Sequence, residues 1–103
     1  MTYQLFIDDE RLPADVTNVV ARSSAEAIEI LGRCGMPNAI AFDHDLGGDD
    51  TSMPIVHWLV DQVVDGALSF PVDFAYSVHS QNPVGASNIR GLLDALLLHF
   101  PRR

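Results

Sequence analysis

Residues 3–11 read YQLFIDDER, in which an apolar run stops abruptly in three acidic residues. A short apolar run that ends in a polar loop predicts a buried β-strand, here over residues 3–7. The pattern returns twice: the run at residues 39–42, AIAF, ends in DHD, and the run at residues 72–78, VDFAYSV, ends in HSQNP. Residues 17–21, TNVVA, predict one more short strand.

Helical patterns fill the gaps between these strands. A first helix is predicted from Ser23, which forms a capping box with Glu26, to Gly35. A second is predicted over residues 51–66, and a third begins at Asn82, an N-cap before proline. The resulting order β-β-α-β-α-β-α is typical of a parallel sheet covered by helices. We therefore expect one α/β domain over residues 1–103, a three-layer fold with a four-stranded parallel sheet of order 2-1-3-4 and three helices.

Composition narrows the classes of function. The 103 residues carry a formal net charge of −8, which argues against binding to duplex nucleic acid or to a membrane surface. A single nucleotide or an RNA end held by a metal stays open, because a cation supplies local positive charge. The single cysteine, Cys34, cannot form an internal disulfide and is assigned to the apolar stripe of the first helix. We expect a cytoplasmic protein.

The polar residues that follow the strands define a candidate site. Carboxyl ends of parallel strands meet at one edge of an open sheet, where ligands bind. Carboxylates brought together there need a counter-charge, so Asp8, Asp9 and Asp43 are predicted to hold a divalent metal. Oxygen ligands suit Mg²⁺, whereas His44 and His79 would add nitrogen ligands that suit Mn²⁺ or Zn²⁺. The two histidines could instead act as general acid and base.

Three segments carry a family resemblance: FIDDER at residues 6–11, FDHDLGG at 42–48 and VHSQNP at 78–83. Together they resemble a family that is related to response-regulator receiver domains and named for cyclic-phosphate processing. The resemblance implies a truncated receiver-like (flavodoxin-like) fold and action on cyclic phosphodiester ends or cyclic nucleotides. It places Asp8 and Asp9 at the metal-binding acids of receivers and Asp43 at the phosphoacceptor position. Receivers carry a lysine that this chain lacks, which argues against signalling through a phosphorylated aspartate.

The preferred function is metal-assisted hydrolysis of a cyclic phosphate, in a nucleotide or at an RNA end. His44 and His79 are predicted to transfer the protons, and Asp45 to orient an imidazole. The candidate substrate-binding residues are Arg11, Ser80 and Asn82. Two other functions stay open: a non-catalytic module that binds a nucleotide or a protein, and a degenerate phosphoacceptor receiver.

Plainer roles are open for three of these residues. Arg11 could pair with Glu10 or Asp15, Asp45 could bond a backbone amide of its loop, and Asn82 could serve only as a helix cap.

The stretch LLDALLL at residues 92–98 is apolar over more than one helical stripe. An uncovered apolar face favours contact with another protein surface, so a homodimer or a protein partner is expected at this helix. The alternative is that Leu97 and Leu98 pack under Phe100.

Overall fold

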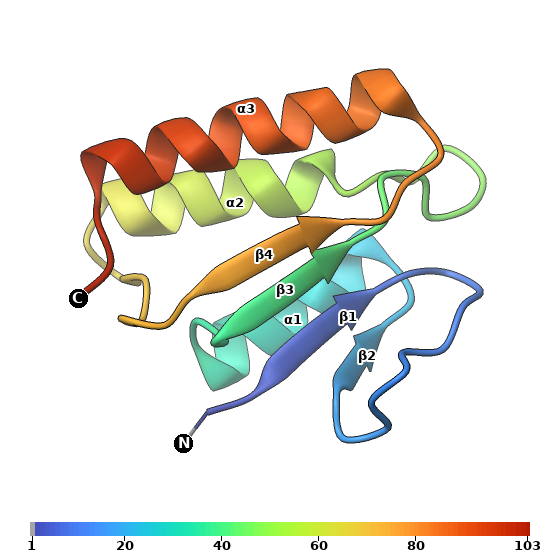
Figure 1. Cartoon of the computed structure of the whole chain (residues 1–103), viewed down its shortest axis with the longest axis horizontal. Coiled ribbons are helices and arrows are strands. Elements are labelled where there is room, and N and C mark those ends of the chain that lie inside the picture. Colours follow the sequence, from blue (N-terminus) through green and yellow to red (C-terminus); the bar gives the residue numbers. More distant parts are fainter. Residues whose placement is uncertain (1) are drawn as a thin grey trace.

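The computed structural model describes residues 2–103. The four strands are all parallel and lie in the order β2-β1-β3-β4, which confirms the predicted sheet (Figure 1). In chain order the elements are β1 (Gln4–Ile7), β2 (Val19–Ala21), α1 (Ser24–Cys34), β3 (Ala39–Phe42), α2 (Met53–Val64), β4 (Ala75–Val78) and α3 (Pro83–His99).

The starts of α1 and α3 follow the capping signals, whereas Ser52 before α2 makes no side-chain cap hydrogen bond. Only the Ser23 half of the predicted capping box forms, because Glu26 accepts from the Arg22 amide instead of the Ser23 amide. Ser23 accepts a hydrogen bond on Oγ from the Glu26 amide at 3.1 Å, and Asn82 accepts one on Oδ1 from the Gly85 amide at 2.9 Å. The start of β4 differs from the prediction, because a turn closed by the Phe74 amide on the Pro71 carbonyl takes the first residues of the expected strand. Cys34 is exposed, so its assignment to the buried stripe of α1 is wrong.

Over residues 2–103 the helices cover one face of the sheet only, so the fold has two layers rather than the expected three. Leu5, Ile40 and Phe42 point toward the helices and are buried. α1 lies beside α2 and α2 beside α3, and the Tyr76 hydroxyl donates to Asp94 of α3 at 2.5 Å. In Figure 1 the sheet lies in front of α1, and no helix crosses the face turned to the viewer.

The handedness of the connections explains the missing layer. The crossovers β2–α1–β3 and β3–α2–β4 step across the sheet in the same direction, and right-handed crossovers in one direction place their helices on one face. Only the step from β1 to β2 runs the other way, and residues 8–18 make it without a helix. The opposite face therefore stays bare.

Among residues 2–103, no helix is both long and apolar enough to cross a lipid bilayer.

Candidate functional site

The tips of β1, β3 and β4 lie side by side, because the strand ladder continues one residue beyond each strand. The Asp43 amide donates to the Ile7 carbonyl at 2.9 Å, and the His79 amide donates to the Phe42 carbonyl at 2.8 Å. Residues separated by more than thirty positions in the sequence are thus fixed in one row by backbone hydrogen bonds.

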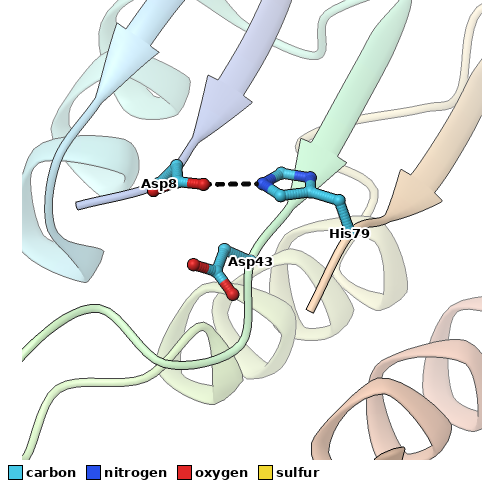
Figure 2. Close-up of side chains that lie close together, drawn as sticks. All are labelled: Asp8, Asp43 and His79. Atoms are coloured by element: carbon cyan, nitrogen blue, oxygen red, sulfur yellow. Dashed lines mark hydrogen bonds and ion pairs between the residues drawn. The ribbon is translucent and has the colours of Figure 1, made fainter. Parts of the chain in front are cut away.

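Three of the predicted site residues meet in this row. Asp8, Asp43 and His79 each offer a ligand atom, and these atoms lie within 4.8 Å of one another. Figure 2 shows Asp8 and His79 directed at each other, with the Asp43 carboxylate beside the pair. The His79 Nε2 atom lies 3.0 Å from Oδ2 of Asp8, whose side chain is only 1% exposed. The convergence expected from the sequence is present.

Asp8 is held by the loop that it starts. Its Oδ1 accepts hydrogen bonds from the amides of Glu10 and Arg11, both at 2.9 Å. The Arg22 guanidinium pins the same loop, because Nη1 donates to the carbonyl oxygens of Asp8 and Arg11 at 2.9 and 2.6 Å. Burial acts to raise the pKa of Asp8, but these two amides and the His79 contact outweigh it, so the pKa lies below its usual range. Asp8 is a fixed carboxylate.

Asp43 has the opposite electrostatic environment. Burial and the negative charge of Asp8 raise the pKa of the Asp43 carboxyl, and Asp9 adds to the effect, while His79 and Arg11 oppose it. A carboxylate in this position is stabilised by a proton or by a cation. The pair therefore combines a carboxylate that stays ionised with one that gains from a positive charge.

This donor set fits a divalent cation. Two carboxylates can serve a hard ion such as Mg²⁺, and the imidazole nitrogen adds a ligand that Mn²⁺ or Zn²⁺ accepts more readily. The contact between Nε2 of His79 and Asp8 also orients the imidazole ring, and it therefore determines which ring nitrogen is available to a metal ion or to a proton.

Asp9 does not join the three-residue group, although the sequence assigned it to the metal. Its carboxylate lies against the backbone of the glycine loop, since a Cβ atom at Gly47 would lie 3.1 Å from Oδ2 of Asp9. Gly47 also has a φ angle of 89°, a left-handed conformation that favours glycine. Asp9 reaches the site through its charge, which acts on the pKa of Asp43.

His44 lies apart from the group as well, against the first turn of α3. Its Nδ1 atom is 3.0 Å from Oδ1 of Asp45, the contact that the predicted role of Asp45 requires. The His44 side chain is 12% exposed and packs on Gly85, where an added Cβ would collide with the ring. Asn82 connects the Asp45 loop to α3, because its Nδ2 donates to Oδ2 of Asp45 at 3.4 Å while its Oδ1 caps the helix.

The remaining predicted residues lie at the rim. The guanidinium of Arg11 donates to the His79 carbonyl at 3.4 Å, so Arg11 bridges the loop after β1 to the end of β4. The Ser80 hydroxyl accepts from the Asn82 amide at 3.0 Å. Arg11 keeps further N–H donors, and the Ser80 hydroxyl keeps its own donor, for a contact with a ligand.

Sequence reasoning missed two neighbours of the site. Arg22 fixes the Asp8 loop from the end of β2, and no local pattern points to it. Phe6 stacks on His79 with ring centroids 4.9 Å apart and an interplanar angle of 5°. Strand alternation could have identified Phe6, because residues 6 and 8 of one strand face the same side of a sheet.

The fold and the site together define a receiver-like α/β domain with an acidic site at the carboxyl edge of its sheet. The chain matches the model of the cyclic-phosphate processing receiver domain over residues 3–95, and it belongs to this family. No curated protein and no solved structure matched the chain.

Proposed function

We propose that this domain hydrolyses a phosphodiester bond in a cyclic phosphate with the help of a divalent metal. The observation that carries the proposal is the meeting of Asp8, Asp43 and His79 within 4.8 Å at the carboxyl edge of the sheet. Membership in the cyclic-phosphate processing family supplies the substrate class.

Asp8 and Asp43 would hold the cation, with His79 as a third ligand or as its neighbour. A bound divalent cation polarises a phosphoryl oxygen and offsets the charge that develops during displacement at phosphorus. Arg11, whose guanidinium lies at the border of the site, would contact another phosphoryl oxygen.

The proton transfers fall to the two imidazoles. Hydrolysis adds water across one P–O ester bond: the water oxygen joins phosphorus, one of its protons goes to a base, and the leaving ester oxygen receives a proton. His79 and His44 are each oriented by a carboxylate, Asp8 and Asp45 respectively, as proton-transferring histidines commonly are. One would take the proton from water and the other would protonate the leaving oxygen.

Turnover tests the proposal. The purified protein is incubated with 2′,3′-cyclic and 3′,5′-cyclic nucleotides in the presence of Mg²⁺, Mn²⁺ or Zn²⁺, and the ring-opened monoester is measured. We expect product with at least one cation, and a loss of about 10²-fold or more in Asp43→Asn. The control Asp61→Asn, on the exposed side of α2, retains activity. Absence of product with every cation would refute hydrolysis.

A module that only binds its ligand makes a different prediction. It would bind a cyclic nucleotide without turnover, and the double variant His44→Ala/His79→Ala would bind as well as the parent. Loss of turnover with retained binding in that double variant supports catalysis instead.

The contact expected at the leucine-rich end of α3 stays a proposal. Leu93 and Leu96 belong to the core and Leu97 is partly buried against it, whereas Leu98 is 77% exposed. Leu98 is therefore the residue through which a second copy or a protein partner would be bound.

A further inference from the structure

The site forms one end of the bare face of the sheet. Side chains alternate along a strand, so Phe6 faces the same side as Asp8, Ala41 the same side as Asp43, and Ser77 the same side as His79. The pairing register places Phe6 opposite Ala41 and Ala41 opposite Ser77. Asp8, Asp43 and His79, the metal-ligand group, form the first row on this face. A second row of side chains, Phe6, Ala41 and Ser77, thus lies about 6.6 Å further toward the amino ends of the strands.

A third row continues the same face. Gln4, Ala39 and Ala75 are paired across β1, β3 and β4 in the way that the second row is. The middle of this face therefore consists of Ala39, Ala41, Ala75 and Ser77, whose side chains are hardly larger than a methyl group. Such a surface is flat, and a planar ring can lie directly on it.

A cavity of about 240 Å³ lies over these rows. Its lining includes the four small residues, with Gln4 and Asn18 as the amide-bearing members, and no lining residue carries a charge at neutral pH. The environment differs sharply from the first row, where carboxylates and an imidazole meet. One end of the face suits a phosphate with its cation, and the other suits a neutral, flat group.

The stack of Phe6 on His79 connects the two environments. β3 lies between β1 and β4, so rings 4.9 Å apart lean toward each other across that strand. Ala41 occupies the position beneath them, and its methyl group leaves room for both rings. The stacked rings thus lie between the carboxylates of Asp8 and Asp43 and the cavity, whose lining does not include them.

We infer that the cavity on the bare face binds the nucleobase of the cyclic phosphate whose phosphate group lies at Asp8, Asp43 and His79. This inference rests on the proposed function, and it specifies a nucleotide, or the last nucleotide of an RNA, as the substrate class. The sugar passes beside the stacked rings of Phe6 and His79, the base lies on Ala39, Ala75 and Ser77, and the amides of Gln4 and Asn18 face its polar edge. Asn and Gln amides pair well with the edges of bases, and stacking contributes strongly to binding of single nucleotides.

The first test uses the unmodified chain with labelled alanine methyl groups. We expect a nucleoside 2′,3′-cyclic phosphate to shift the methyl resonances of Ala39, Ala41 and Ala75 through the ring current of the base. Inorganic phosphate leaves these resonances in place, and the exposed helix residues Ala25 and Ala95 respond to neither ligand. If the His79 imidazole responds to the nucleotide while the methyl resonances of Ala39, Ala41 and Ala75 (the floor resonances) do not change, the inference is overturned.

The second test separates the base from the chemistry. Ala39→Leu/Ala75→Leu fills the cavity at its far end, away from the metal-ligand group, and Ala25→Leu is the matched control on α1. We expect KM for the nucleoside cyclic phosphate to rise about tenfold in the double variant, with turnover of ethylene phosphate, a base-free cyclic ester, unchanged. Equal efficiency of the parent on the two substrates would refute the base site while leaving hydrolysis intact. Absence of turnover with shifted floor resonances would refute hydrolysis while leaving the base site intact.

Discussion

Replacing Asp43 with asparagine should stabilise the fold while strongly lowering the proposed hydrolysis. The Asp8 and Asp43 ligand atoms lie within 4.8 Å of each other, Asp8 is buried and Asp43 is half-buried. Two unit charges at that separation repel by about 1 kcal/mol in water and about 3.5 kcal/mol at an effective dielectric of 20. Asparagine keeps the shape of the side chain and removes one of the charges.

The expected net gain is about 1 kcal/mol, because the variant also loses the attraction of Asp43 to His79 and Arg11. For a domain of this size, that gain raises Tm by roughly 4–8 °C. The assay is thermal unfolding followed by circular dichroism at pH 7 in the presence of a chelator. Asp61→Asn, which removes an exposed charge from α2, is the control and should shift Tm by far less.

The pH dependence gives a second check. The pKa of Asp43 is raised in the folded state, so its proton stabilises the fold fully below the unfolded pKa of about 3.9, and this contribution is lost as pH rises through the folded pKa. The advantage of Asp43→Asn should therefore be largest at neutral pH and should fade as the pH approaches 4. A variant that is less stable than the parent at pH 7, or a gain that does not change with pH, would refute the electrostatic reasoning.

Three further predictions concern Asp8, Gly85 and Leu98. Asp8→Ala removes three hydrogen bonds and leaves two amides without their acceptor, so it should lower the free energy of unfolding in urea by about 2–4 kcal/mol at pH 7. Because the pKa of Asp8 is lowered in the folded state, this loss should shrink as pH falls through that pKa; an equal loss at every pH would contradict it. Gly85→Ala places a methyl group in the His44 ring and should lower the free energy of unfolding by about 1–3 kcal/mol. Gly91→Ala, on an open part of the same helix, should raise it by roughly 0.5–1 kcal/mol. Equal effects of the two variants in chemical denaturation would argue against the His44 contact. If α3 mediates self-association, Leu98→Glu should reduce the mass measured by light scattering to that of a monomer, and an unchanged larger mass would exclude this surface.

The sequence was sufficient for the sheet order and for the meeting of distant acids. Both follow from rules that need only element type and position: right-handed crossovers, and parallel strands that end at a common edge. Asp8, Asp43 and His79 are therefore recognisable from the printed chain as neighbours, because each directly follows an apolar run.

The directions of individual side chains around the site could not be predicted, because they depend on contacts with distant loops that residue spacing does not reveal. His44 follows Asp43 directly, yet it turns to α3, where Gly85 leaves space for its ring. Asp9 follows Asp8 and turns instead to Gly47. Neighbouring residues after a strand leave in different directions, and the choice between directions is made by loops from elsewhere in the chain.

The bare face could have been predicted but was not. The connection from β1 to β2 is a loop, and the helices that follow the other strands all fall on one side. Combining the handedness rule with that missing helix gives two layers, and the small residues at alternate positions of β3 and β4 agree with it.

Whether the three strand tips form one cation site can be measured directly by paramagnetic broadening with Mn²⁺. Backbone amide resonances are recorded during a titration of the parent chain and of Asp43→Asn. We expect the strongest broadening at Asp8, Asp43 and His79 at low Mn²⁺ concentration, and its loss in Asp43→Asn. Broadening that centres on exposed acids such as Asp61 and Asp65, or that is the same in both proteins, would contradict a shared site at the sheet edge.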